Sequence, residues 1–110
     1  ALQSRSLHDL IGVSGETSLI GTVSRLSKEK GVDVLIEGFS VLSPEMSGTH
    51  LVIIGSGPEK RALEEQVESL ELKHRVHFTG HRTDVATILP SFAAYVQPSR
   101  FESIYILDVF

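Results

Sequence analysis

The amino-acid sequence predicts an α/β fold of three layers, in which helices cover both faces of a parallel sheet. Strand-like and helix-like segments alternate along the 110 residues, a pattern typical of parallel strands joined by right-handed crossovers. The strand-like runs, "HLVIIG" most clearly, are apolar at successive positions, as are strands that are covered on both faces. The length suits one hydrophobic core. We therefore expect one domain over residues 1–110, with residues 1–16 as a lead-in segment.

The first half of the chain predicts two strands and one helix. Residues 17–23, "TSLIGTV", are short, apolar and β-branched, which favours a buried strand. Residues 32–42 carry apolar side chains at helical spacing, and Asp33 near their start suits the positive end of a helix dipole. The turn residues of "SPEMSG" end this helix. The second strand is expected over residues 50–55.

The second half continues the alternation. A helix is expected over residues 56–70, with Pro58 in its first turn, and a strand over residues 75–80, "RVHFTG". A short helix follows within residues 83–92, capped by Thr83 or Asp84 and ended by Pro90. Two further expectations complete the fold: a strand over 93–99 and a helix over 102–110.

Composition excludes several classes of function. The net charge of -4 argues against general affinity for nucleic acid, so any anion site must be local. The absence of cysteine excludes disulfides and thiolate metal sites and is typical of a reducing compartment. No apolar run approaches the roughly 20 residues that span a bilayer, so no transmembrane segment is expected. Because the chain begins without Met and stops within an apolar run, we expect it to be part of a longer protein.

Four polar loops follow the four expected parallel strands. They are "SRLSKEKG", "GSGP", "TGHRTD" and "QPSRFES", and ligands of parallel sheets bind at this carboxyl edge. In the first loop, Arg25 offers a planar fork for phosphate oxygens and Lys30 a point charge. Together they could hold a diphosphate without a metal ion. The alternative is that these cations are solvated loop charges, which is the interpretation we adopt for Lys28.

The second loop contains the glycine pair Gly55 and Gly57. Glycines between a strand and a helix permit close backbone approach, and the helix N-terminus offers free N–H groups to an anion. A dinucleotide-binding fingerprint would need a third glycine where Lys60 stands, and an acidic residue about 20 positions after the motif begins, where Arg75 stands. The pair is also compatible with an ordinary tight turn. The three histidines of residues 74–81 lack supporting carboxylates, so no metal site is expected.

The segments "IGTVSRLSKEKGVDVLIEGFSVL", "LVIIGSGPEKRALEEQVESLELKHRVHFTGHRTDV" and "AYVQPSRFES" together resemble a known family. Their order and spacing, over about residues 17–103, are similar to the C-terminal domain of family 4 of the retaining glycosyltransferases (group 1), which have the GT-B fold. That fold pairs two Rossmann-like domains, and the second binds a nucleotide-sugar donor. The resemblance thus implies a Rossmann-like donor-binding domain that serves metal-independent sugar transfer with retention.

The resemblance also assigns roles to the two loops discussed above. The basic residues of the family's first loop fall on Arg25 and Lys30, which would grip the donor diphosphate. The family's glycine pair falls on Gly55 and Gly57, in the turn beneath the donor.

Further implied roles fall on the two later loops. Gly80, His81 and Arg82 would lie against the nucleobase, largely through backbone groups. Glu102 would be the catalytic carboxylate near the hydroxyls of the donor sugar, with Ser99 beside it.

Three positions depart from the family's pattern. Phe110 stands where a second glutamate normally holds the ribose, Tyr105 replaces a small residue, and Ser24 replaces a common glycine. Asp108 is two positions away from Phe110, or about 200° around a helix, and so could not substitute. These departures leave an alternative open: a non-catalytic Rossmann-like scaffold or oligomerisation module that has lost donor binding. A different nucleotide-sugar enzyme, such as an epimerase, is a third possibility.

The resemblance implies the following partners and setting. The ligands are a nucleotide-diphosphate sugar and a carbohydrate or lipid acceptor, the acceptor being held mainly by an N-terminal domain outside this chain. No cofactor and no nucleic acid are implied. The location would be cytoplasmic, with membrane association through the missing part, and this chain alone would be inactive. Donor base, donor sugar and oligomeric state are left open.

Overall fold

A five-stranded sheet forms the centre of the computed structural model, which describes residues 6–98 and 105–108. Its order is β3-β2-β1-β4-β5. The strands are β1 (Ser18–Val23), β2 (Thr49–Ile54), β3 (Val76–Gly80), β4 (Ala94–Gln97) and β5 (Tyr105–Asp108). The first four run parallel, and β5 pairs antiparallel with β4. The predicted parallel sheet is therefore confirmed, with one antiparallel strand added at its edge.

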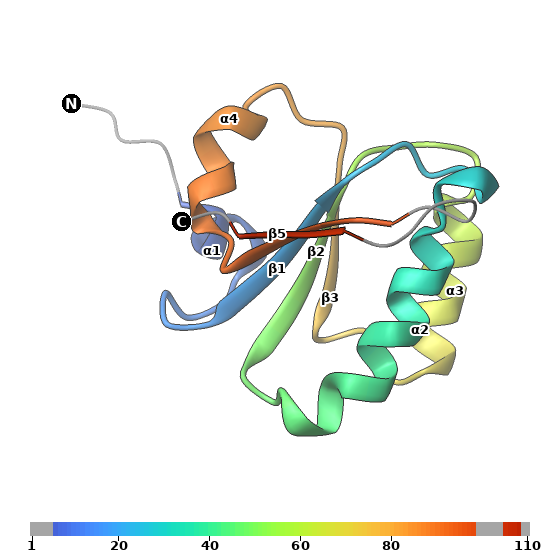
Figure 1. Ribbon diagram of the computed structural model, residues 1–110, viewed down its shortest axis with the longest axis horizontal. Helices are drawn as coiled ribbons and strands as arrows, with labels where there is room; N and C mark the ends of the chain where they lie inside the picture. The colour runs from blue at the N-terminus through green and yellow to red at the C-terminus, as the bar shows by residue number, and fades with distance from the viewer. Residues whose placement is uncertain (1–5, 99–104, 109–110) are drawn as a thin grey trace.

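Helices cover both faces of this sheet (Figure 1). They are α1 (Leu7–Ile11), α2 (Val32–Leu42), α3 (Lys60–Ser69) and α4 (Val85–Ile88), with 3₁₀ turns η1 (Lys28–Lys30), η2 (Ser43–Glu45) and η3 (Leu89–Ser91). Helices α2 and α3 lie side by side on one face, while α1 and α4 lie on the other. The three-layer arrangement is the one that the alternation of strands and helices predicts.

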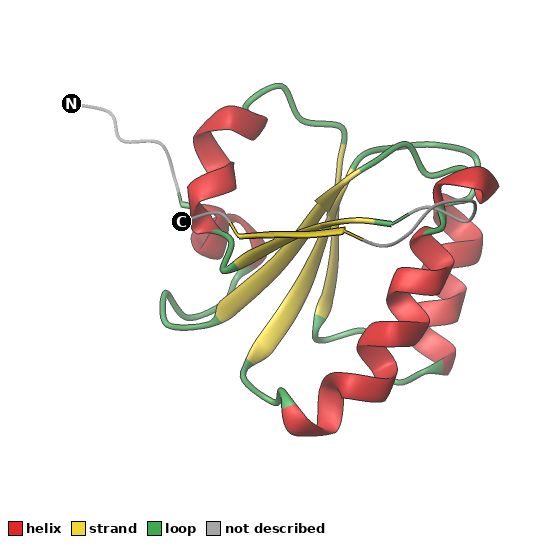
Figure 2. Cartoon of the chain, in the orientation of Figure 1, coloured by secondary structure: helices red, strands yellow, loops and turns green. Residues whose placement is uncertain are grey.

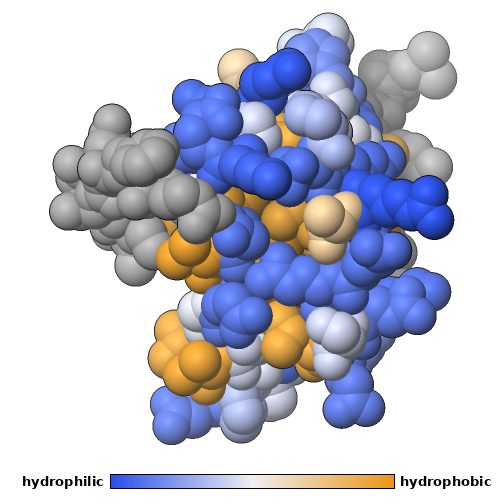
Figure 3. Space-filling model, turned by 90° about the vertical axis from the view of Figure 1, so that its right-hand side faces the viewer, coloured by the Kyte–Doolittle hydropathy of each residue, from blue (hydrophilic) through white to orange (hydrophobic). Residues whose placement is uncertain are grey.

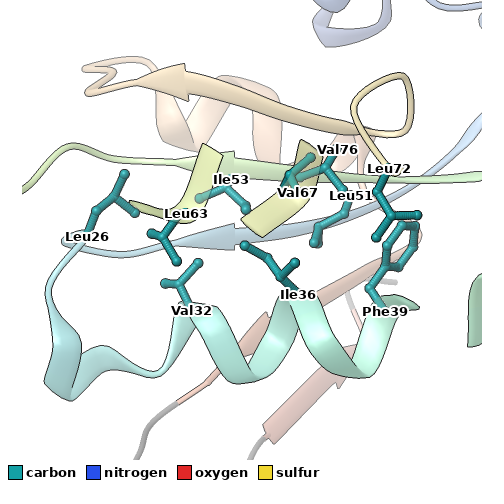
Figure 4. Close-up of a cluster of buried hydrophobic side chains, with 10 residues drawn as sticks. All are labelled: Leu26, Val32, Ile36, Phe39, Leu51, Ile53, Leu63, Val67, Leu72 and Val76. Carbon is teal, nitrogen blue, oxygen red and sulfur yellow. The ribbon is translucent and has the colours of Figure 1, made fainter. Parts of the chain in front are cut away.

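The larger hydrophobic cluster lies between the sheet and the helices α2 and α3 (Figure 4). The apolar stripe of α2 points at the sheet through Val32, Ile36 and Phe39. It packs with residues of α3, β2 and neighbouring segments: Leu26, Leu51, Ile53, Leu63, Val67, Leu72 and Val76. Helical spacing places these side chains on one face, which explains why the periodicity predicts the helix.

A second cluster covers the opposite face of the sheet. It consists of Leu7, Leu19, Val52, Ile54, Ile88 and Phe92. Alternate residues of β2 enter the two clusters, with Leu51 and Ile53 on one face and Val52 and Ile54 on the other. All four side chains are buried, so the continuous apolar run of this strand reflects burial on both of its faces.

The outer face of the α2–α3 layer is mostly hydrophilic, with smaller apolar areas between the polar side chains (Figure 3). Three exposed apolar residues belong to α2: Val34, Val41 and Leu42. None of the helices in the described ranges combines the length and apolar character that a bilayer crossing requires.

Two expectations about elements differ from the structure. The helix expected over residues 102–110 is wrong, because residues Tyr105–Asp108 form the strand β5, and the helical argument about Asp108 fails with it. Its aromatic and β-branched residue types favour an extended backbone, and the open edge of β4 supplies a pairing partner. The lead-in segment also contains a helix that was not predicted, α1, which contributes the buried side chain of Leu7 to the second cluster.

Candidate functional site

The loops that follow β1, β2 and β3 gather at the carboxyl edge of the sheet, where Figure 2 shows them in green along the top. The chain adds β2 and then β3 on one side of β1, and afterwards places β4 on the other side. The gap between β1 and β4 is therefore the point where the strand order reverses. Crevices at such reversals are the usual ligand sites of open α/β sheets.

A cavity of about 550 Å³ opens at this point. Its lining residues come from three loops and from the ends of β1 and β4: Val23, Ser24, Arg25, Lys30, Gly55, Ser56, His81 and Gln97. The structure thus brings together four residues that the sequence singled out, namely Arg25, Lys30, Gly55 and His81. The volume lies within the range of ligand pockets in general.

The two cations of the basic loop lie on the same cavity, although Arg25 precedes η1 and Lys30 is its last residue. Arg25 and Lys30 both line it, whereas Lys28 does not. Their charges also act on Glu29, whose pKa is lowered first by a hydrogen bond from its own backbone N–H, and further by Lys30 and Arg25. Among the described residues, no ion pair involves Arg25 or Lys30. The site therefore presents two positive charges to a ligand, in a chain with a net charge of -4.

The glycine pair explains how the first two loops can touch. Gly55 has a φ of +143°, and a Cβ on it would lie 1.8 Å from the backbone oxygen of Ser24. A Cβ on Gly57 would lie 2.5 Å from the backbone oxygen of Leu26. The absence of side chains lets Leu26 donate its N–H to Ser56 O at 3.0 Å and accept from Glu59 N at 2.8 Å. Gly55 lines the cavity, whereas Gly57 lies behind it, against Leu26.

The three candidate residues at the end of β3 and in the loop after it make different contacts. His81 lines the cavity. The oxygen of Gly80, which has a φ of +79°, accepts a hydrogen bond from Gly55 N at 2.9 Å and so joins the second and third loops. Arg82 donates through Nε and Nη2 to the two carboxylate oxygens of Asp84, each at 2.8 Å.

The contact between Arg82 and Asp84 changes the pKa of both side chains. The hydrogen bonds from Arg82 lower the pKa of Asp84, and those to Asp84 raise the pKa of Arg82. Asp84 occupies the N-cap position of α4, but its side chain makes no capping bond. The guanidinium of Arg82 is therefore engaged by Asp84 and does not line the cavity. Its predicted contact with a nucleobase would require it to leave this pair or to use backbone groups.

Sequence reasoning missed several residues of this cavity. Ser56 and Val23 adjoin predicted residues, and Ser24 enters the sequence analysis as a departure from the family's pattern and not as a site residue. Gln97 is the most informative omission, because it is a polar residue at the carboxyl end of an otherwise apolar strand, and that signal was available. Two other predicted residues, Ser99 and Glu102, lie outside the described residues.

One of the three histidines of residues 74–81 makes a contact between two strands of the sheet. His77 in β3 shares a hydrogen bond with His50 in β2, with Nδ1 of His50 2.9 Å from Nε2 of His77. Over the ranges that the structure describes, no group of three or more histidine or acidic side chains is arranged to hold a metal ion.

Known proteins share this sequence pattern and fold. The model of the family "Glycosyl transferases group 1" matches residues 6–105. A glycogen synthase of Rhodopseudomonas palustris (strain BisA53) is 35% identical over 103 residues, which cover 88% of this chain and 20% of that protein. The chain therefore spans about a fifth of the length of the curated relative.

Solved structures agree with this match. WaaG, described as a glycosyltransferase involved in lipopolysaccharide biosynthesis, superposes with a TM-score of 0.74 at 26% identity, over 86% of this chain and 26% of that chain. The pneumococcal O-GlcNAc transferase GtfA, solved with UDP and GlcNAc, gives 0.67 at 30% identity, over 74% of this chain and 16% of that one. The predicted Rossmann-like fold class and the resemblance are thus confirmed, and the chain belongs to the glycosyl transferases group 1.

Proposed function

We propose that this chain is the donor-binding half of a retaining, metal-independent glycosyltransferase, which transfers a sugar from a nucleotide-diphosphate sugar to an acceptor hydroxyl. The observation that supports this most directly is the convergence of Arg25, Lys30 and the Gly55 backbone on one cavity. Family membership supports sugar transfer in general. The UDP in the pneumococcal relative supports a nucleotide diphosphate as part of the ligand.

The chemistry of the reaction matches the charge of the cavity. When the bond between the anomeric carbon and the diphosphate oxygen breaks, its electron pair remains on the diphosphate and the sugar becomes oxocarbenium-like. The acceptor oxygen forms the new bond, and its proton passes to the departing diphosphate. Fixed positive groups near that oxygen lower the barrier because they meet charge as it develops. We assign Arg25 and Lys30 to this role, with Glu102 and Ser99 as the groups near the donor sugar.

Titration of the chain with UDP, GDP and ADP tests the proposal. We expect saturable binding of at least one of them, and a loss of about 10- to 100-fold in affinity in Arg25→Ala and Lys30→Ala, since each removes a charged hydrogen-bonding group. Two matched controls remove the same charge elsewhere. Arg61→Ala changes a side chain that is 92% exposed on α3, and Lys28→Ala changes the same loop outside the cavity. Both controls should leave affinity within about twofold.

The titration also tests the alternative function. Phe110 stands where the family pattern has a second glutamate, which favours a module that kept the fold and lost donor binding. Absence of binding to all three nucleotides would support that scaffold and refute the donor-binding proposal. Equal weakening by Arg25→Ala and Arg61→Ala would also refute it, because binding would then follow net charge rather than the cavity.

A further inference from the structure

The strands β1 and β4 separate before they reach the carboxyl edge of the sheet. On its other side, β1 stays paired with β2 up to Val23 and Ile54. With β4, it pairs only at Ile20 with Ala94 and at Gly21 with Tyr95, although β4 continues to Gln97. The separation opens the crevice that contains the cavity, and it leaves Val23 without a neighbouring strand on the β4 side.

Buried or half-buried backbone groups need hydrogen-bond partners, and those of Val23 face the opened gap. Ser24 donates its N–H to Ile54 O at 2.9 Å, toward β2, so the preceding N–H and C=O in the strand face β4. Pairing with β4 has ended there. Two side chains of β4 replace it.

Tyr95 and Gln97 supply these replacement bonds. Val23 donates its N–H to Tyr95 Oη at 3.2 Å. The oxygen of Val23 accepts from Tyr95 Oη at 3.4 Å and from Gln97 Nε2 at 3.3 Å. Gln97 Nε2 also donates to Tyr95 Oη. Because a carbonyl oxygen can only accept, the amide of Gln97 must turn its nitrogen toward Val23. The two side chains thus form a clip on the end of β1.

The clip acts two residues before the proposed diphosphate-binding arginine. Val23 and Gln97 line the same cavity as Arg25, while Ser24 is tied on its other side to β2. The end of β1 is therefore held from both sides at the position where the chain leaves the sheet. A displacement of about 1 Å at a binding group is enough to weaken its interaction with a ligand.

We infer that Tyr95 and Gln97 are positioning residues, which hold the end of β1 so that Arg25 meets the diphosphate of the ligand. The inference rests on the proposed function, because it assigns Arg25 to the diphosphate. It also gives Tyr95 a polar task besides its packing against the second hydrophobic cluster. Neither residue was a predicted site residue, since their relation to Arg25 spans about 70 positions of sequence.

The first test is a double-mutant cycle on UDP binding by the chain. Tyr95→Phe removes one oxygen and keeps the ring, and it should weaken UDP binding by about three- to tenfold. In an Arg25→Ala background, the same substitution should cost less than about twofold, because the residue through which it acts is gone. Gln97→Met, which keeps the length of the side chain, should behave in the same way. Ile88→Val, a buried change in the same cluster, should lower stability and leave affinity unchanged.

The second test needs no ligand. Amide hydrogen exchange at Val23 should accelerate at least severalfold in Tyr95→Phe relative to the rest of β1, because that N–H loses its acceptor. Unchanged exchange at Val23 would overturn the clip whether or not a nucleotide binds.

The outcomes separate this inference from the proposed function. If the wild-type chain binds UDP and Tyr95→Phe binds it equally well, or if the loss is the same with and without Arg25, the positioning role is wrong and the donor-binding function stands. If no nucleotide diphosphate binds to the wild-type chain, both fail.

Discussion

Gly55 illustrates how one missing side chain permits the site to form. The residue has a left-handed φ of +143°, and its Cα faces the backbone oxygen of Ser24, which a Cβ would meet at 1.8 Å. That contact brings the turn after β2 against the end of β1. On the β3 side, the N–H of Gly55 donates a hydrogen bond to Gly80 O at 2.9 Å. Glycine is needed here for its small size as much as for its backbone freedom.

The substitution Gly55→Ala should therefore destabilise the fold. Both the backbone conformation and the collision with Ser24 are unfavourable, and together they should cost about 2–4 kcal/mol of the free energy of unfolding. Urea titration followed by circular dichroism measures this. Gly48→Ala is the matched control, because nothing lies within 4 Å of a Cβ at that position, and it should change stability by no more than about 1 kcal/mol. Equal effects of the two substitutions would contradict the argument.

At the scale of elements, the pairing of β2 with β3 contains a titratable contact. The rings of His50 and His77 are inclined by only 8°, with centroids 5.1 Å apart. Nδ1 of His50 and Nε2 of His77 are 2.9 Å apart, which is a hydrogen-bond distance. The two nitrogens therefore share one N–H···N hydrogen bond, which exists only while one of them is unprotonated.

The surroundings of this pair favour the neutral rings. Burial lowers the pKa of His50, and the charges of Arg75 and His74 lower it further. Burial also lowers the pKa of His77, with a contribution from His50. Arg75 is itself held in place, because its guanidinium donates to the backbone oxygens of Ser43, Thr49 and Met46 and lies over the ring of Phe39.

These shifts predict that the fold loses stability in mild acid. Since both pKa values are lower in the folded chain, the unfolded chain binds more protons below pH ~6.5. The stabilising contribution is thus complete above that pH and declines as the pH falls through the folded pKa values. Urea titrations between pH 7.5 and 5 should show a steeper decline for the wild type than for the double variant His50→Asn and His77→Asn. Parallel declines would show that other groups cause the pH dependence.

At the scale of the whole molecule, the charge distribution and the exposure of the cavity determine how strongly the chain attracts an anionic ligand. The net charge is -4, while Arg25 and Lys30 are exposed at the cavity. Water therefore reaches these cations and weakens their field compared with a closed site. The chain also covers only 16% and 26% of the two solved chains compared above.

We predict that the 110-residue chain binds a nucleotide diphosphate but does not transfer sugar. Rate acceleration requires an oriented acceptor and exclusion of water from the reacting atoms. We expect the open cavity of this chain to provide neither. Incubation with labelled UDP-, GDP- and ADP-sugars and a carbohydrate acceptor, beside a full-length glycogen synthase as positive control, should give product only in the control. Robust transfer by the chain would disprove the prediction.

From the sequence alone, the order of strands and helices between residues 17 and 97 could be predicted, together with the two loops that carry the cations and glycines. The spacing of apolar residues reflects burial on one or both faces of a strand or helix. The charged residues and glycines of a loop can be recognised from the loop's own few residues. For these reasons β2, α2 and the positions of Arg25, Lys30 and Gly55 could be predicted from short stretches of sequence.

Which of these residues meet depends on how the chain folds in three dimensions. The fold turned Gly57 toward Leu26, paired Arg82 with Asp84, and brought Gln97 from the end of β4 to the cavity that Arg25 also lines. It also made a strand of Tyr105–Asp108, where an open sheet edge outweighed the expected helix. The contact of Gly57 with Leu26 and the meeting of Gln97 and Arg25 at one cavity join residues that lie tens of positions apart. Contacts across such a separation leave no periodic pattern in the sequence. The Arg82–Asp84 pair is local, but the sequence does not show which of several possible partners a loop arginine takes.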